Sequence, residues 1–433
     1  MNTLKAVRGT RDLLPPETAL WNRIEATARD VFARYNFGEI RTPIFEDTAL
    51  FARGVGEETD IVSKEMYTWE DRARAQSEKT QSLTLRPENT AGVVRAYIEH
   101  GLGESGQLQK LFYIGPQFRR ERPQKGRYRQ FAQIGAEVLG PPSSGSESPL
   151  RDAELLEMLA TLLDELGIAG WTLELNSVGS QADRERYNQA LRAALVPVVG
   201  QMCADCQRRA VTNPLRVLDC KVPADQPIIE KLPVIADSLD EPSRAHFAQV
   251  TAALDAAGVP YTLNHRLVRG LDYYTRTTFE FTHGGLGAQN ALLGGGRYDG
   301  LSEAIGGPKA PGIGFAIGED RLVLTLQAAL DQNPAPPLKA DAFIAPLGEN
   351  LNPAALVLAR ELRYKGLWIE LGEGSFRLKK SFEAAEKTAR RIVILGEDEL
   401  QSGILTVKTF STGIQTKVPR AELAVFLADS SPE

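Results

Sequence analysis

A stretch of concentrated positive charge stands between two apolar segments in the first half of the chain. Residues 111–140 read LFYIGPQFRRERPQKGRYRQFAQIGAEVLG, in which β-prone runs flank a segment rich in Arg, Lys, Pro and Gly. Within this segment a single acid, Glu121, stands among six basic residues: Arg119, Arg120, Arg122, Lys125, Arg127 and Arg129. The pattern predicts a long β-hairpin with a basic tip.

Arg119 and Glu121 have the most informative spacing in this stretch. Two residues apart on a strand, their side chains would share one face of the sheet. A planar guanidinium grips a phosphate through two N–H groups and a carboxylate accepts from an amine, so the pair suits a nucleotide. The alternative is a solvated loop without further function. The net charge of −6 limits any contact with a polyanion to local basic patches.

A second stretch, residues 266–281, reads RLVRGLDYYTRTTFEF and combines an arginine with two adjacent tyrosines. The glycine permits a turn there, which would gather Arg269, Tyr273 and Tyr274 ahead of an alternating strand. Core packing could explain one tyrosine, but hardly the arginine and both tyrosines together. Further along, three successive glycines in ALLGGGRYDGL indicate that the backbone approaches another group closely.

Two smaller features also point to function. Arg321 stands in the first turn of a predicted helix. A cation there opposes the helix dipole, so helix stability does not explain this arginine and a binding role is indicated. Glu88, Asn89 and Thr90 form a polar cluster where a predicted strand turns into a helix. The structural alternative for the cluster is helix capping, which Asn89 or Thr90 would perform well.

The three cysteines argue against a disulfide framework in a chain of this length. Cys203 and Cys206 form a CxxC and Cys220 follows, so they would supply three ligands of a zinc site if His246 were the fourth. A CxxC without a second pair favours buried free thiols instead. We therefore assign no metal ligands, and whether the three cysteines bind a metal stays open.

The elements that must position these residues fall into several regions. The chain has 433 residues, 42% hydrophobic and 24% charged, which is typical of a globular protein of two or three domains. We expect a first domain over 1–332 with a helical insertion at about 181–260, a Pro-rich linker at 333–340, and a small α/β domain over 341–433. We find no signal peptide and no apolar run long enough for a membrane span, and we expect a cytoplasmic protein.

With these stretches in view, the chain resembles the histidyl-tRNA synthetases of class II along essentially its whole length. The resemblance rests on KAVRGTRDLLP, on EIRTPIFE, FRRERPQKGRYRQFAQIGAE and GIGFAIGEDRLVL as motifs 1, 2 and 3, and on RGLDYYTRTTFEF and LLGGGRYDGL as histidine-specific signatures. It implies an α+β fold: a catalytic domain with a mixed, mostly antiparallel sheet flanked by helices, a helical insertion, and a C-terminal anticodon-binding domain.

The resemblance implies a two-step reaction, in which histidine and ATP form histidyl-adenylate and the histidyl group then passes to the 3′ end of histidine tRNA. Chemistry of this kind depends chiefly on positioning and charge neutralisation. Arg119 and Arg269 would be catalytic, on opposite sides of the α-phosphate. The resemblance implies that ATP is bound by Arg119, Glu121, Arg127 and Arg321. Mg²⁺ is expected on the β and γ phosphates, and no permanently bound cofactor is expected.

For histidine, the resemblance implies a set of contacts around the α-amino group, the carboxylate and the ring: Glu88, Asn89, Thr90, Arg119, Gln133, Glu137, Arg269, Tyr273 and Tyr274. Neutral imidazole has one donor and one acceptor nitrogen, which the Glu137 carboxylate and the Tyr274 hydroxyl would satisfy from opposite sides. An analogue without either nitrogen would leave a buried group unpaired, and sites of this kind discriminate by roughly 10⁴ to 10⁵.

The implied partners are histidine tRNA and a second copy of the chain. Gln124, Lys125 and Arg129 on the hairpin tip would meet the tRNA acceptor end, and the motif 1 region implies a homodimer. Ala132 departs from the family pattern, which has His in RQFHQ, so it receives no role. The alternative is a non-catalytic, synthetase-like regulatory subunit of histidine biosynthesis, which typically lacks the C-terminal domain and an intact motif 2.

Overall fold

The computed structural model describes residues 3–56, 59–71, 80–124, 126–268, 271, 273–286, 290–332 and 339–428. The chain divides into two units, Met1–Asn333 and Pro334–Glu433, and each is described by itself.

The first unit is built on an eight-stranded sheet whose strand order is β1-β5-β6-β11-β10-β9-β7-β8. The pairs β1–β5 and β7–β8 are parallel, and the pairs between them are antiparallel. Its strands are β1 (Gly38–Glu39), β5 (Gln109–Phe118), β6 (Gln130–Leu139), β7 (Trp171–Ser177), β8 (Thr262–Leu263), β9 (Thr275–His283), β10 (Ala291–Arg297) and β11 (Gly312–Gly318).

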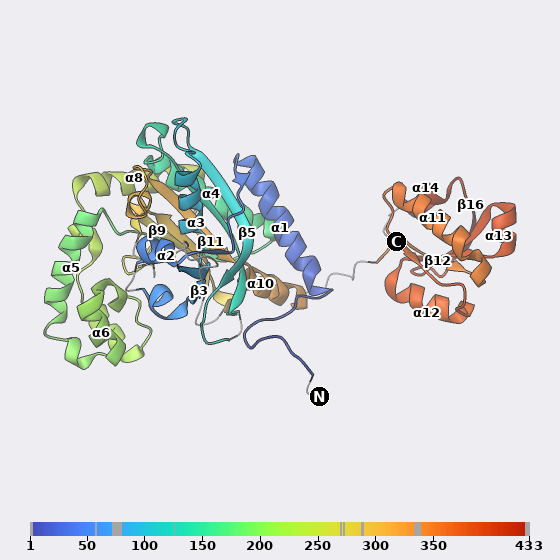
Figure 1. Cartoon of the computed structure of the whole chain (residues 1–433), viewed down its shortest axis with the longest axis horizontal. Coiled ribbons are helices and arrows are strands. Elements are labelled where there is room, and N and C mark those ends of the chain that lie inside the picture. The colour runs from blue at the N-terminus through green and yellow to red at the C-terminus, as the bar shows by residue number, and fades with distance from the viewer. Residues whose placement is uncertain are drawn as a thin grey trace. The chain divides into compact units, whose positions relative to one another are not determined.

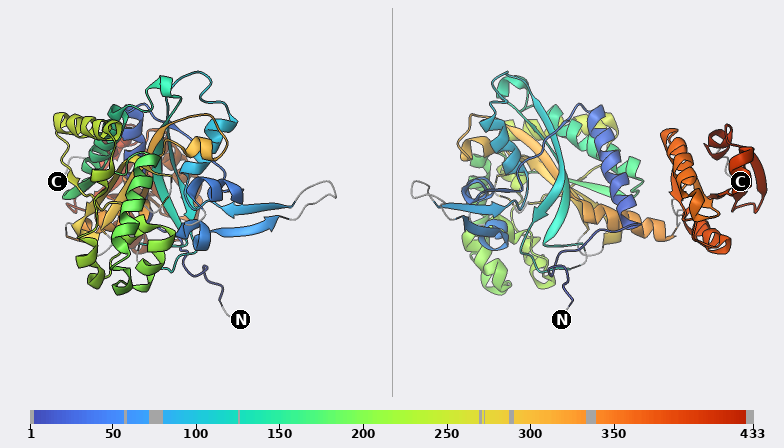
Figure 2. Two further views of the ribbon diagram at one scale, coloured as in Figure 1. Left: turned by 90° about the vertical axis from the view of Figure 1, so that its left-hand side faces the viewer. Right: turned by 45° about the vertical axis from the view of Figure 1, so that its right-hand side comes forward.

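A small second sheet projects from this body, as the blue strands of Figure 2 show. Its order is β2-β4-β3, with β2 (Phe45–Asp47), β3 (Tyr67–Asp71) and β4 (Gln81–Leu85). The EIRTPIFED segment therefore supplies β1 to one sheet and β2 to the other, with Pro43 in the connection between them. A proline cannot donate to a strand ladder, which explains why the two strands are separate.

The helices of the first unit pack around the two sheets or form the insertion. Their bounds are α1 (Glu17–Arg34), α2 (Thr48–Val55), α3 (Thr90–Glu99), α4 (Pro149–Leu166), α5 (Gln181–Leu195), α6 (Ala204–Thr212), α7 (Gln226–Ile229), α8 (Glu241–Ala257), α9 (Leu301–Ala304) and α10 (Glu319–Gln332). In Figure 1, α5 and α6 lie on the side of the unit opposite α1. The stretch expected as a helical insertion thus contains α5 to α8 in a row.

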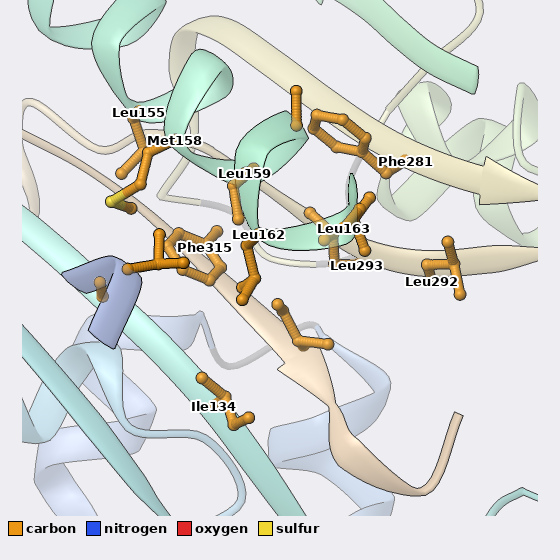
Figure 3. Packing of buried hydrophobic residues seen from close by; sticks show 14 of the residues in the cluster. Ile134, Leu155, Met158, Leu159, Leu162, Leu163, Phe281, Leu292, Leu293 and Phe315 are labelled. Atoms are coloured by element: carbon orange, nitrogen blue, oxygen red, sulfur yellow. The ribbon is translucent and has the colours of Figure 1, made fainter. Parts of the chain in front are cut away.

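One face of the large sheet is packed against the core, and the other carries polar side chains. Successive side chains of a strand point to opposite sides, so each strand contributes to both faces. On β6, Ile134, Ala136 and Val138 belong to the main core, whereas Gln133 and Glu137 face the other way. Figure 3 shows the core side, where leucines of α4 pack against Phe315 and Leu293 of the neighbouring strands. Truncating one buried leucine of this kind to alanine costs roughly 2 to 5 kcal/mol.

Helix α4, which covers this core, has clear sequence signals at both ends. Ser148 accepts from the backbone N–H of Leu150, and Pro149 occupies the first helical position. Gly167 ends the helix in the left-handed conformation, with φ of 79°. The helix also carries Asp152, which is fully buried beneath the sheet.

Asp152 is the centre of a buried polar network that joins α4 to α8, β9 and β10. Its carboxylate accepts from Arg297 Nε at 2.9 Å, from Thr277 Oγ1 at 2.6 Å, and lies 2.9 Å from His246 Nε2. Arg297 is also buried, and its second partner is Asp299. Removing one partner of the buried Asp152–Arg297 ion pair would leave the other charge without it, which typically costs 3–5 kcal/mol.

The second unit is a five-stranded sheet of order β13-β12-β14-β15-β16 with helices around it. Its parts are β12 (Ala342–Pro346), α11 (Asn352–Tyr364), β13 (Ile369–Leu371), α12 (Leu378–Thr388), β14 (Arg391–Leu395), α13 (Glu397–Ser402), β15 (Ile404–Thr409), β16 (Gln415–Pro419) and α14 (Leu423–Ala428). Strands β13, β12 and β14 are parallel, and β15 and β16 are antiparallel additions. The predicted α+β class is confirmed by the two sheets together.

Candidate active site

Two adjoining cavities lie on the face of the large sheet that Gln133 and Glu137 share. The larger is a cleft of about 830 Å³ and the smaller a pocket of about 150 Å³. Their common wall is made by four residues from the hairpin and the central strands: Arg119, Gln133, Gly294 and Ala316. A ligand that spans both cavities must therefore pass Arg119.

The long hairpin with a basic tip is present as predicted. Strands β5 and β6 pair in register from Gln109 opposite Leu139 to Phe118 opposite Gln130. The tip closes in a turn where Gln124 and Arg127 exchange backbone hydrogen bonds of 3.1 and 2.9 Å. Gly126 takes the left-handed conformation there, with φ of 74°, which a residue with a side chain would adopt at a cost.

One detail of the hairpin prediction is wrong. Arg119 and Glu121 lie beyond the end of β5, in the loop, and not on a strand. They nevertheless stay together, because Arg119 Nη1 lies 3.8 Å from Glu121 Oε1, while Arg127 Nη1 donates to Glu121 Oε2 at 3.2 Å. All three side chains line the large cleft.

Arg119 is held in place before any ligand arrives. Its Nε donates to the carbonyl oxygen of Pro87 at 2.9 Å, and its guanidinium lies 5.2 Å from the ring centre of Phe131. These contacts use one N–H and one face of the guanidinium, and the Arg119 side chain lines both cavities. A preorganised cation of this kind costs little to position when charge develops nearby.

Glu88 has the capping role that the sequence assigned to its neighbours. Its carboxylate accepts from the backbone N–H groups of Thr90 at 2.8 Å and Ala91 at 3.0 Å, at the start of α3. Asn89 instead accepts from Thr42 at 2.5 Å and does not line the small pocket. Burial raises the pKa of Glu88, although the two N–H groups oppose that shift.

Glu137 is fully buried and contacts Thr90 and Tyr298, which line the small pocket. Thr90 Oγ1 donates to one carboxylate oxygen and Tyr298 to the other, both at 2.7 Å. A Cβ at Gly314 would stand 1.7 Å from Glu137 Oε2, so glycine is required there. Burial raises the pKa of Glu137 to about 8, despite the two hydroxyl donors.

Three tyrosines form one side of the small pocket. The rings of Tyr273 and Tyr274 lie 4.7 Å apart, and Tyr273 meets Tyr298 edge-on at 5.9 Å. All three line the pocket with Glu88 and Thr90. The sequence pointed to the first two, but Tyr298 was missed because the RYDG that follows the glycines was assigned no role.

Two of the three glycines of β10 are needed by the sheet itself. A Cβ at Gly295 would stand 2.1 Å from the carbonyl oxygen of Gly314, and one at Gly296 would stand 2.6 Å from that of Thr277. The close approach that the sequence indicated is therefore to the two neighbouring strands. The third glycine, Gly294, forms part of the shared wall between the cavities.

Arg321 lines the large cleft and donates to the carbonyl oxygen of Ala291 at 2.5 Å. Its neighbour Asp320 pairs with Arg11 at 3.0 Å, which also pairs with Glu17 at 2.7 Å. Arg11 in turn lies 4.7 Å from the ring centre of Tyr128 on the hairpin. The GTRD segment thus ties α10 to the hairpin tip, a role the sequence alone did not reveal.

The remaining residues predicted to form the site are three on the hairpin tip and Arg269. Arg129 donates to the carbonyl oxygen of Arg8 at 3.2 Å, so its side chain faces the N-terminal segment. Gln124 is exposed at the tip. Arg269 and Lys125 lie outside the described residues.

The helical insertion contributes basic side chains that sequence reasoning missed. Arg209, Arg216 and Lys221 line the large cleft opposite the hairpin. Arg216 is paired with Asp219 at 3.3 Å, so it is held toward that wall. The signal was available in CQRRAVTNPLRVLDCK, where basic residues recur between the cysteines. Its meaning depended on how the insertion folds back, which local patterns do not reveal.

Comparison with known proteins places the chain among relatives that match its whole length. A family model described as histidyl-tRNA synthetase matches residues 9–322, and one described as anticodon binding domain matches 341–429. The histidine–tRNA ligase of Koribacter versatilis (strain Ellin345) is 73% identical over 425 residues, covering 98% of this chain and 96% of that protein. The histidine–tRNA ligase of Solibacter usitatus (strain Ellin6076) is 56% identical, covering 99% and 100%.

Solved structures agree with the sequence relatives. The crystal structure of the apo histidyl-tRNA synthetase of S. aureus superposes with a TM-score of 0.78 at 37% identity, covering 98% of this chain and 100% of that one. The chain belongs to the histidyl-tRNA synthetase family, which confirms the resemblance read from its motifs. No helix in the described part of the chain is long and apolar enough to cross a membrane.

Proposed function

We propose that this chain is a histidine–tRNA ligase, which activates L-histidine with ATP and transfers the histidyl group to the 3′ end of histidine tRNA. The full-length match to ligases of that name supports the assignment. The observation that carries it is the shared wall, because adenylate formation requires a small amino-acid pocket that opens onto a nucleotide cleft at a cation. Arg119 is that cation.

In the first step the histidine carboxylate attacks the α-phosphate of ATP, and pyrophosphate leaves. We assign Arg119 to the α-phosphate and the carboxylate, with Arg269 on the opposite side. Glu121 would accept from the adenine amino group, while Arg127 and Arg321 would bind the phosphates and the base. Their common position along the large cleft supports these roles for the described residues. Mg²⁺ enters as part of the ATP substrate.

Histidine would occupy the small pocket. Gln133 Oε1 is buried without a hydrogen-bond partner in the described part of the chain, which supports its role as an acceptor for the α-ammonium group. Glu88 and Thr90 would complete that end of the site. Tyr274 and Glu137 would satisfy the two imidazole nitrogens, with Tyr273 beside them. Asn89, which turns to Thr42, is better explained as part of the structure around α3.

The tRNA acceptor end would meet the hairpin tip through Gln124, Lys125 and Arg129, and the anticodon would meet the second unit. The family model for an anticodon binding domain over 341–429 supports the second contact. We further propose a homodimer formed through the motif 1 region, supported by the exposed side chains of Ile44, Phe45 and Trp69. We propose that the enzyme acts in the cytoplasm.

The regulatory-subunit alternative has no support from the relatives, which are ligases by name. The deciding experiment is histidine-dependent ATP–pyrophosphate exchange without tRNA, with the other nineteen amino acids as controls. We expect exchange with histidine alone. A folded protein that binds histidine but catalyses no exchange would contradict the proposal.

A further inference from the structure

The three cysteines converge with one carboxylate inside the helical insertion. Cys203, Cys206, Cys220 and Asp225 each present one ligand atom, and these four atoms all lie within 4.8 Å of one another. Cys203 Sγ lies 3.9 Å from Cys220 Sγ, and Cys220 Sγ lies 3.2 Å from Asp225 Oδ2. Cys206, Cys220 and Asp225 are buried and Cys203 is partly exposed.

The distance of 3.9 Å between the sulfur atoms of Cys203 and Cys220 is close to the edge of a tetrahedral coordination sphere. With Zn–S bonds of about 2.3 Å, two sulfur ligands of one ion stand roughly 3.8 Å apart. A disulfide would need its sulfurs at about 2.05 Å, so the three thiols are not cross-linked. Three thiolates with one carboxylate suit zinc, whereas calcium and magnesium require oxygen ligands.

The backbone holds two of the candidate ligands in place. The N–H of Cys203 donates to both oxygens of Asp225, at 3.1 and 3.2 Å, and the N–H of Val222 donates to Cys220 Sγ at 3.4 Å. Such outer contacts are what orients the ligands of a metal site. No salt bridge to Asp225 occurs in the part of the chain that the structure describes, although this carboxylate is only 1% exposed. A buried carboxylate without a cation is costly unless something neutralises it.

His246, the fourth ligand considered from the sequence, is not part of the cluster. Its Nε2 lies 2.9 Å from Asp152 in the network beneath the sheet. We propose that Cys203, Cys206, Cys220 and Asp225 bind one structural zinc ion. All four positions are filled by protein groups, which is the mark of a structural site and not a catalytic one.

The ion would join segments that form the insertion's side of the large cleft. Cys203 and Cys206 stand at the start of α6, while Cys220 and Asp225 follow the turn at Pro214–Val217. Arg209 on α6 and Lys221 beside Cys220 both line the cleft. Zinc therefore fixes the relative positions of two stretches that carry these cations. The site does not depend on the proposed reaction, because it is built inside the insertion.

The first experiment measures the metal content of the full-length chain, expressed with zinc in the medium and purified without chelators. We expect about one zinc per chain. Cys206→Ser and Asp225→Asn should each lower the zinc content strongly. Asp205→Asn is the matched control, because Asp205 is an exposed carboxylate on the same helix that pairs with Arg208. It should retain the full zinc content.

A second measurement on the unaltered chain keeps the proposal testable if the variants fail to fold. Cobalt added after zinc removal should give the intense visible bands of a tetrahedral ion and the near-ultraviolet bands of thiolate ligands. A folded chain with no zinc, three thiols that react with a thiol reagent and no cobalt spectrum would overturn the proposal. A disulfide between any two of the cysteines in the purified chain would also overturn it.

Discussion

Thr90 Oγ1 donates a hydrogen bond of 2.7 Å to Glu137 Oε1, which joins the first turn of α3 to the centre of β6. Tyr298 holds the other oxygen of the same carboxyl group from the opposite side. Two of the hydroxyl groups that line the small pocket, those of Thr90 and Tyr298, therefore already donate their hydrogens to Glu137. These two hydroxyl groups present oxygen lone pairs to a ligand, and this favours a ligand with N–H donors.

The raised pKa of Glu137 makes histidine binding depend on pH. The pKa of Glu137 is raised to about 8, so below pH 8 its carboxyl group is mostly protonated in the free protein. An N–H donor on the ligand favours the ionised carboxylate. We expect proton release on histidine binding at pH 7, and an affinity that rises between pH 6 and 8. Calorimetry in buffers with different ionisation enthalpies measures this release.

Glu137→Gln separates the contribution of the protein from that of histidine's own imidazole, which titrates near pH 6.5. The variant should release markedly fewer protons than the unaltered chain. Equal proton release from both proteins would show that Glu137 does not change its protonation on histidine binding, and would contradict the prediction.

Gly314 leaves the space that Glu137 occupies. Gly314→Ala would place a Cβ 1.7 Å from Glu137 Oε2, so the carboxyl group or the strand must move. Overpacking of this kind typically costs 1–3 kcal/mol, and we expect weaker histidine binding as well. Gly200→Ala, where a Cβ meets nothing within 4 Å, is the control. Thermal unfolding and histidine titration measure both effects, and similar behaviour of the two variants would argue against the packing role.

Arg119 lines both cavities, whereas Arg321 lines only the large cleft, so their substitutions should have different effects on the KM values for histidine and ATP. Arg119→Ala should raise the KM for both histidine and ATP, and slow ATP–pyrophosphate exchange by at least about 10²-fold. Arg321→Ala should raise the KM for ATP alone, because Arg321 lines the large cleft and not the pocket. Arg120→Ala, an exposed neighbour, should change neither. An unchanged histidine KM in Arg119→Ala would remove this residue from the shared wall.

Because Glu319 is buried, we expect the stability of the folded protein to depend on pH. Glu319 is fully buried, both its oxygens lack partners in the described part of the chain, and burial raises its pKa to about 8 from 4.5. Above pH 4.5 the unfolded chain loses this proton while the folded chain keeps it, so the group destabilises the fold increasingly up to pH 8. Glu319→Gln should therefore raise the unfolding temperature more at pH 8.5 than at pH 5. An equal shift at both values would contradict the assignment.

Local patterns were enough to predict much of the fold. The long hairpin was predicted from β-prone runs and turn residues, since strands and tight turns depend on near neighbours. The end of β5 before Arg119 was not predictable, because it depends on where β6 stops pairing. Glu88 as the cap of α3 was missed for a related reason: its side chain reaches forward over a turn whose geometry the sequence does not state.

The parts of the site that sequence reasoning missed are contacts between distant segments. Arg11 with Asp320 and Asp152 with Arg297 join residues that are 309 and 145 positions apart in the sequence. Asp225 illustrates the same limit, since it is one of many carboxylates in the chain and only folding sets it beside the thiols. Pairings of this kind have no period and no local signal.

The wall shared by the two cavities also matters for ligand design. A compound held in the small pocket and a second held in the cleft would sit on either side of Arg119 and Gln133. Joining the two compounds by a short linker that passes these residues would raise the affinity, because binding of one half raises the local concentration of the other half at its own cavity. The gain depends on linker length more than on any new contact, so a series of linked fragments would measure the width of the passage.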